Sequence, residues 1–225
     1  EESPRTERPK PPFTRSTMQQ DAGSRLGWGA QITMRVAQRL YENGYITYMR
    51  TDSINLSQQA ITAARNAAKA LYGADHVADA PRVYQGKTKN AQEAHEAIRP
   101  AGDTFKTPGE LAPELSRDEF ALYDLIWKRT VASQMADAKK MQMRVDFDAT
   151  TNDGKKTIFR ANGSVITFPG FLAAYDDVVS DENKDEESED KRLPAMTVGQ
   201  SVKVNEYTCE GHETKPPARY TEPTQ

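Results

Sequence analysis

The residues with the clearest chemical use lie in one short run, residues 46–53, in which Tyr48 and Arg50 stand two positions apart. The run has a strand-like composition, and side chains along a strand point to the same face at every second residue. We therefore expect the phenol and the guanidinium to share one face. A tyrosine that attacks an anionic phosphodiester needs a fixed cation beside it. The pairing suggests covalent chemistry on a nucleic-acid backbone.

Each of these side chains also has an ordinary structural interpretation. An isolated strand tyrosine such as Tyr48 usually buries its ring and leaves its hydroxyl at the surface. In the chemical interpretation, Arg50 favours the phenolate and holds the phosphate with a planar fork of N–H groups, which lysine lacks. Asp52 could orient Arg50 or cap the turn that follows. The residues alone do not choose between these two roles for Asp52.

A second run, residues 90–100, contains His95 and Arg99. If the run is helical, the two side chains lie one turn apart on one face, where two donors could bracket a phosphate. Pro100 discourages a helix at Arg99. A lone histidine is more often structural, and Arg99 is equally suited to a salt bridge with Glu96.

The elements that must hold these residues begin with a helical part at residues 13–138. Four helices are expected there, each with a capping residue before it or a glycine after it. They begin at Ser16 or Thr17, at Ala30, after Ser57 and after Ser116. The Tyr48 run would form a short strand between the second and third helices. Residues 1–12, rich in proline and charge, are expected to be an extended N-terminal segment.

A β-rich part is expected at residues 139–215. It would begin with an alternating strand at 141–147, continue through hairpin turns at 152–154 and 162–163, and end with a strand at 200–209. The acidic run 176–190 is expected to be a disordered loop. These features predict an α+β fold, in which a mainly helical domain carries the tyrosine on a short strand and a β-rich segment follows it.

Composition limits the possible partners and location of the chain. The net charge of −3 argues at first against binding to DNA. The run 176–190, however, holds nine acids and one lysine and so carries a charge of −8, which leaves −3 − (−8) = +5 on the rest of the chain. This balance permits a basic groove. No apolar stretch approaches the ~18 residues of a membrane span. The single cysteine, Cys209, excludes an intramolecular disulfide and fits a cytoplasmic protein.

Together the motifs resemble a known family. Read with Gly44 and Tyr45 before it and residues 54–57 after it, the Tyr48 run resembles the active-site motif of bacterial type IA DNA topoisomerase I. Residues 90–100 resemble a second block of that family, and the match continues at 11–20, 33–41 and 216–221. Methionine at position 49 favours topoisomerase I over topoisomerase III, where proline is usual. Arg15 departs from the family, which usually has threonine there.

The resemblance implies an activity and a role for each site residue. Tyr48 would attack a DNA phosphodiester and form a transient 5′-phosphotyrosine link. Arg50 would stabilise the scissile phosphate, and His95 would contact the DNA backbone beside it and assist catalysis. Asp52 and Arg99 would be further DNA contacts. The implied activity is that of an ATP-independent isomerase, which relaxes negatively supercoiled DNA by cleaving and rejoining a single strand.

The resemblance also implies that this chain is an internal fragment of a larger enzyme. The family binds Mg²⁺ through an acidic cluster in a Toprim domain, and nothing in this sequence resembles it. We expect no metal site in the chain, no activity without the Toprim and C-terminal DNA-binding regions, a hinge role for residues 139–215, and the start of the next domain at 216–225. The alternatives are a non-catalytic single-stranded-DNA-binding module and a tyrosine recombinase, whose arginine and histidine groups normally precede the nucleophile.

Overall fold

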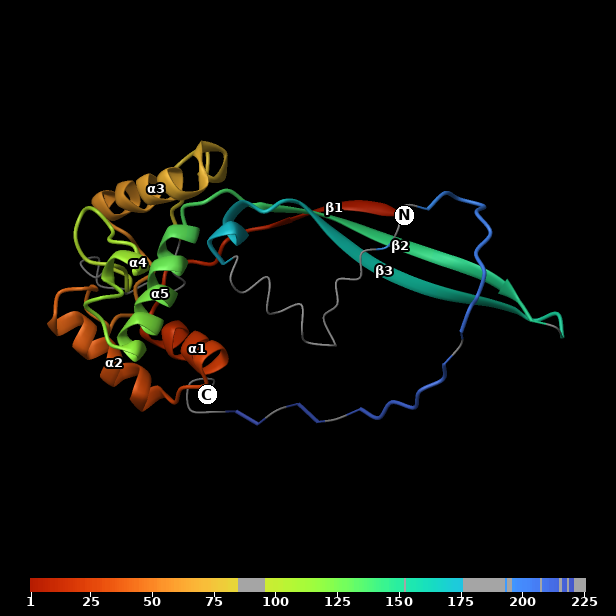
Figure 1. The fold of residues 1–225 in the computed structure, drawn as a ribbon, viewed down its shortest axis with the longest axis horizontal. Coiled ribbons are helices and arrows are strands. Elements are labelled where there is room, and N and C mark those ends of the chain that lie inside the picture. Colours follow the sequence, from red (N-terminus) through yellow and green to blue (C-terminus); the bar gives the residue numbers. More distant parts are fainter. Residues whose placement is uncertain are drawn as a thin grey trace.

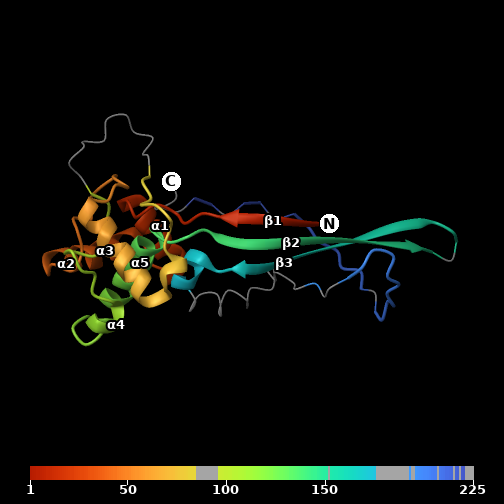
Figure 2. The same ribbon diagram turned by 90° about the horizontal axis from the view of Figure 1, so that it is seen from above.

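The structure is a computed structural model that describes residues 1–84, 96–151, 153–175, 193, 196–206, 208–214, 216–217 and 219–220. Its helices gather into a body at one end, and a three-stranded antiparallel sheet extends away from that body as a long ribbon (Figure 1, Figure 2). The predicted α+β class is confirmed.

The helical body is built from elements whose ends follow local capping signals. Its helices are α1 (Arg15–Leu26), α2 (Ala30–Glu42), α3 (Gln58–Tyr72), α4 (Pro108–Leu111) and α5 (Arg117–Ala132), with short 3₁₀ helices η1 (Ala74–His76) and η2 (Gly170–Tyr175). Ser57 and Ser116 accept bonds from the N–H groups of the first turns of α3 and α5, as predicted. The first helix starts slightly earlier than expected, because Thr14 forms a capping box with Thr17.

The hydrophobic core lies within this body, with α5 at its centre. Leu122, Ile126 and Val131 of α5 are fully buried, and Phe13, Met18 and Leu40 join them from the N-terminal half of the chain. The inward face of α3 is lined with alanines, which let neighbouring backbones approach closely. Because burial of each large apolar side chain contributes about 1.5–3 kcal/mol, this core accounts for most of the stabilisation of the body.

The ribbon consists of β1 (Glu2–Glu7), β2 (Ala138–Thr150) and β3 (Lys156–Phe168), in the order β1-β2-β3. Strand β1 pairs only with the first half of β2, from Ala138 to Met143. Strands β2 and β3 pair along their whole lengths and are joined by a turn. Within β2 and β3 only Ala138 and Ser164 are buried. The ribbon is therefore held mainly by its backbone ladder and by cross-strand side-chain pairs.

Two sequence predictions for the β-rich part are wrong. Asn162–Gly163 is not a hairpin, because β3 passes straight through it and these residues pair with Arg144 and Met143. A local turn signal is overridden there by the continuous ladder. The described residues of 200–209 form no strand and are exposed, with no strand edge paired to them. The acidic run 176–190 lies outside the described residues.

The ribbon is joined to the body at a tightly packed junction. Gly170 has a φ of +52°, and a Cβ atom there would lie 2.3 Å from the Asp137 carbonyl oxygen. Asp137 also forms an ion pair with Arg82. The ring of His76 in η1 lies 5.0 Å from the ring of Phe168 at the end of β3. None of the helices in the described part of the chain is long and apolar enough to cross a bilayer.

Candidate active site

The tyrosine run begins where α2 ends in a glycine turn. Gly44 has a φ of +77°, a left-handed conformation that glycine adopts without steric cost. Its N–H donates to the Tyr41 carbonyl at 2.9 Å, and the N–H of Tyr45 donates to the Leu40 carbonyl at 2.8 Å. These two bonds form a Schellman motif, which ends the helix and turns the chain back beside it.

The run is then fixed by pairing with a distant segment. Ile46 forms an antiparallel bridge with Pro100. The N–H of Thr47 donates to the Arg99 carbonyl at 2.9 Å. The Thr47 hydroxyl donates to the Ala97 carbonyl at 2.8 Å and accepts from the Arg99 N–H at 3.0 Å. These bonds hold the backbone at the residue immediately before Tyr48.

Side chains from position 48 to position 53 alternate between solvent and core. The exposed members are Tyr48, Arg50 and Asp52, and the buried members are Met49, Thr51 and Ser53. The predicted short strand is wrong beyond the bridge at Ile46, because no described backbone segment forms a ladder with Tyr48. The exposure of the side chains nevertheless keeps the two-residue period, so the three predicted residues all stand out of the core.

Tyr48 has an exposed ring, and the backbone before it is held by hydrogen bonds. Its side chain is 47% exposed, and among the described residues its hydroxyl has no hydrogen-bond partner. Its ring meets that of Tyr41 edge-on, with centroids 5.2 Å apart. The Tyr45 hydroxyl instead donates to Glu114 at 3.0 Å, and this bond raises the pKa of Tyr45. A phenol that holds its proton more tightly is the poorer nucleophile.

Arg50 and Asp52 carry exposed charges with no ion pair among the described residues. The guanidinium of Arg50 is therefore available for an anion from solution. The N–H of Arg15 donates to the Thr51 carbonyl at 2.9 Å, which fixes the run on its far side. This bond places Arg15, an exposed residue at the start of α1, beside Thr51, the residue that follows Arg50.

Arg99 lies in the core and has its own partners. Its guanidinium donates to the Glu96 carboxylate, at 2.7 Å in the shortest bond, and to the carbonyls of Pro100 and Gly102. The predicted alternative of a salt bridge with Glu96 is thus present, and a DNA contact by Arg99 stays a prediction. The described end of this run, from Glu96, is extended rather than helical because Ile98 pairs with Phe13. His95 lies outside the described residues.

Glu96 connects three parts of the site. Burial alone would raise the pKa of Glu96, but hydrogen bonds from Arg99 and Ser57 offset this effect and lower it below the ordinary value. The N–H of Ser57, which caps α3, donates to the Glu96 carboxylate at 2.7 Å. The Glu96 carboxylate therefore links the start of α3 to the guanidinium of Arg99.

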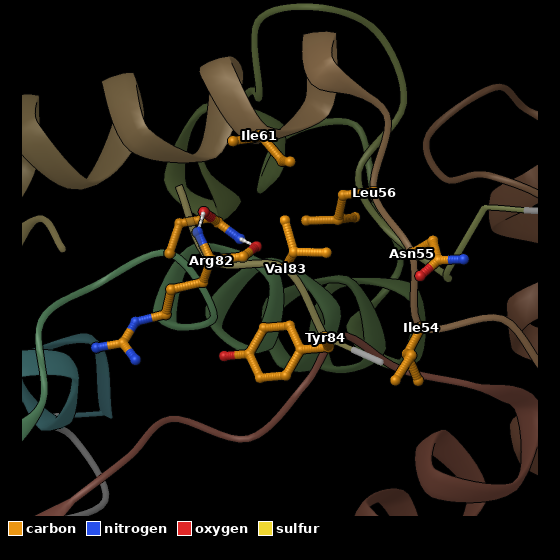
Figure 3. Close-up of a pocket in the computed structure, with 8 residues that line it drawn as sticks. Ile54, Asn55, Leu56, Ile61, Arg82, Val83 and Tyr84 are labelled. Carbon is orange, nitrogen blue, oxygen red and sulfur yellow. Dashed lines mark hydrogen bonds between the residues drawn. The ribbon is translucent and has the colours of Figure 1, made fainter. Parts of the chain in front are cut away.

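Two other features of the described residues concern possible ligands. No group of three or more histidine, cysteine or acidic side chains in these ranges is arranged to hold a metal ion. A cavity of about 130 Å³ lies near the tyrosine run and is mainly apolar (Figure 3). Its lining residues are Ile54, Asn55, Leu56, Ile61, Arg82, Val83, Tyr84 and Gln134.

Sequence reasoning identified the exposed residues of this site but missed the contact between Tyr41 and Tyr48. The contact depends on the turn at Gly44, which returns the chain to the side of α2. An asparagine and a glycine directly after a helical pattern are a signal for such a turn. The signal predicts the reversal but not which side chains meet across it.

Comparisons with known proteins agree with the motifs. A family model described as DNA topoisomerase matches residues 1–224. The chain is 54% identical to DNA topoisomerase 1 of Mycolicibacterium smegmatis and 53% identical to that of Streptomyces coelicolor; each alignment covers 99% of this chain. The solved full-length topoisomerase I of Thermotoga maritima is similar with a TM-score of 0.63 and 37% identity, over 78% of this chain and 28% of that one.

The chain spans about a quarter of the length of the curated relatives it matches: 24% of the Mycolicibacterium protein and 23% of the Streptomyces protein. The matched residues include both runs that carry the candidate site. The predicted family is confirmed, and this chain belongs to the bacterial DNA topoisomerase family.

Proposed function

We propose that this chain supplies the strand-cleaving tyrosine of a type IA DNA topoisomerase, an isomerase that relaxes negatively supercoiled DNA. Membership of the family supports the proposal. The observation that carries it is the half-exposed Tyr48, whose hydroxyl has no hydrogen-bond partner among the described residues. Its side chain stands out of the core on the same two-residue period as Arg50, which forms no ion pair within those residues. A nucleophile and an anion-binding group are thus both accessible to a single strand of DNA.

In the proposed reaction, the Tyr48 oxygen attacks the phosphorus of a phosphodiester and loses its proton. The bond between phosphorus and the 3′ oxygen breaks, and that oxygen takes up a proton and leaves as a 3′ hydroxyl. The product is a 5′-phosphotyrosine ester, and attack by the 3′ hydroxyl reverses each step. Resealing needs no ATP because the ester conserves the bond. Arg50 holds two non-bridging oxygens and stabilises the charge that develops on them.

The remaining assignments extend this proposal to the whole enzyme. His95 would contact the DNA backbone beside the cleaved bond and assist catalysis, and Asp52 and Arg99 would be further contacts. The β-rich segment would act as the hinge that lets the tyrosine domain move away from the rest of the enzyme. Magnesium, which supplies charge neutralisation in such enzymes, would bind in a Toprim domain outside this chain. The enzyme would act in the cytoplasm, associated with the nucleoid.

Substitution of Tyr48 by phenylalanine tests the proposal, with this chain placed in a full-length relative in exchange for the matching segment. The unsubstituted protein should form a denaturation-resistant adduct with a labelled single-stranded oligonucleotide. Tyr48→Phe should form none, while its affinity for the oligonucleotide in a gel-shift assay stays nearly unchanged. Equal loss of binding and cleavage would contradict the assignment. Binding without any adduct in the unsubstituted protein would instead indicate a non-catalytic binding module.

The isolated chain offers a second test, which concerns the division of labour. Because most DNA contacts and the proposed metal site lie elsewhere, the purified chain should not relax supercoiled plasmid at any magnesium concentration. An agarose gel that resolves topoisomers would show this directly. Robust magnesium-dependent relaxation by the chain alone would overturn the assignment of the metal site to another domain.

A further inference from the structure

We propose that Tyr41 is a positioning residue for Tyr48, and that its ring keeps the Tyr48 side chain in the orientation that presents the hydroxyl to DNA. This inference rests on the proposed function of Tyr48 and adds a residue that lies outside its motif. The two ring centroids are 5.2 Å apart and the ring planes cross at 69°. In this edge-to-face geometry the positive edge of one ring meets the negative face of the other, which is attractive.

The backbone around Tyr48 is already fixed, so rotation of the side chain is the main freedom left to it. Thr47 is held by bonds to Ala97 and Arg99 on one side. On the other side Met49 is only 3% exposed. A half-exposed tyrosine whose hydroxyl has no partner among the described residues would otherwise populate several staggered rotamers. Contact with Tyr41 selects among them.

Tyr41 is not needed for the packing of its own helix. It is 42% exposed, whereas the buried face of α2 is formed by Val36, Ala37 and Leu40. Its carbonyl accepts the bond from Gly44, but its side chain takes no part in that turn. The Tyr41 ring can therefore be removed without loss of the turn that brings Tyr48 to this place.

An exposed aromatic ring near bound DNA has a second possible use, which is to stack on a base. A stacking residue contributes to affinity and leaves the rate of the chemical step unchanged. A positioning residue does the opposite, because it acts on the reactive geometry of a strand that is already bound. Measurement of affinity and cleavage rate together separates these two roles.

Proton NMR of the isolated chain tests the ring contact without any need for activity. The Tyr48 ring signals are identified by their loss in Tyr48→Phe. The unsubstituted chain should show cross-relaxation between the rings of Tyr41 and Tyr48, and Tyr41→Ala should move the Tyr48 signals towards those of a free tyrosine. Ile32→Ala is the matched control, because Ile32 is 46% exposed on the same helix. Absence of the cross-relaxation, or unchanged Tyr48 signals in Tyr41→Ala, would overturn the proposal.

The kinetic test uses the full-length relative that carries this chain and measures single-turnover adduct formation at saturating oligonucleotide. Tyr41→Ala should slow cleavage roughly two- to twelve-fold with an unchanged Kd, which is the range that corresponds to one aromatic pair. Tyr41→Phe, which keeps the ring, should restore the rate. An unchanged rate in Tyr41→Ala, or a loss confined to Kd, would refute the positioning role.

The two proposals fail in different ways. If Tyr48→Phe still forms an adduct, Tyr48 is not the nucleophile and the proposed function is wrong. If Tyr48→Phe is inactive but Tyr41→Ala cleaves at the normal rate, the function stands and only the role of Tyr41 is refuted.

Discussion

The helical body and the β-ribbon are stabilised in different ways. The body encloses a core with members from Phe13 to Ala174, and it has capped helices and a partly buried ion pair near the tyrosine run. The ribbon has two long strands with Ala138 and Ser164 as their only buried residues, and it depends on its backbone ladder. The predicted chemistry lies on the body. The proposed nucleophile, which would have to meet a phosphate accurately, is thus carried by the part of the chain with the larger core.

The largest effect is expected where the two regions meet. Gly170→Ala should lower the free energy of unfolding by about 3–5 kcal/mol, because the new methyl group meets the Asp137 carbonyl and the backbone is left-handed. Gly154→Ala is the matched control, since Gly154 also has a positive φ but has no atom within 4 Å of its Cβ position. Its cost should be about 1–2 kcal/mol. Chemical denaturation followed by circular dichroism would measure both, and equal costs would show that the junction is not tightly packed.

A matched pair of arginine substitutions should sharpen the contrast between body and ribbon. Arg99→Met leaves the partly buried Glu96 carboxylate without its cation and should cost about 2–4 kcal/mol. Arg160→Met breaks a cross-strand pair with Asp146 that is exposed to solvent, and its effect should be hard to detect and smaller still in high salt. Denaturation at low and high ionic strength would compare them. A ribbon substitution as costly as the body substitution would contradict the proposed difference.

A smaller effect is expected at the turn that returns the chain to α2. Gly44→Ala should destabilise the body by about 1–2 kcal/mol, because alanine resists the left-handed conformation even though its methyl group meets no atom. The substitution should also weaken the ring contact between Tyr41 and Tyr48, since the Schellman turn brings them together. Thermal unfolding and the NMR signals of Tyr48 would report the two effects. A stabilised variant would show that the turn is not left-handed in solution.

The mildest prediction concerns pH. Because the folded-state pKa of Glu96 is lowered, the stabilisation by its ionised form is complete above the ordinary glutamate value of 4.5 and is lost as the pH falls through the lowered value. Glu96→Gln should therefore show a shallower fall in stability than the unsubstituted chain between about pH 5 and about pH 3. Denaturant midpoints over this range would test it. Parallel curves for the two proteins would mean that the pKa of Glu96 is the same in the folded and the unfolded chain, which would contradict the prediction.

Features set by neighbouring residues could be predicted from the sequence, and features set by distant contacts could not. Ser57 and Ser116 cap the predicted helices because a cap needs only the following turn. The turn signal at 162–163 failed because the pairing of β3 with β2 decides that backbone. The extended conformation around Arg99 depends on distant contacts, since Ile98 pairs with Phe13 and the N–H of Thr47 donates to the Arg99 carbonyl.

The same distinction between local and distant causes applies to the candidate site. The two-residue period predicts that Tyr48 and Arg50 share one face, because alternation along a strand-like run is a local property of the backbone. The neighbour of Tyr48 could not be predicted, since it depends on how the chain returns to α2. Local periodicity therefore identified the chemical groups, and tertiary contacts determine how they are oriented.

Tandem mass spectrometry of the covalent adduct would test the central claim most directly. The full-length relative that carries this chain would be reacted with a single-stranded oligonucleotide and digested with trypsin. The peptide of residues 40–50 then holds three tyrosines, at positions 41, 45 and 48. Fragment ions should place the added 5′-phosphorylated nucleotide on Tyr48. Attachment to Tyr41, to Tyr45 or to any residue outside this peptide would contradict the assignment of Tyr48 as the nucleophile.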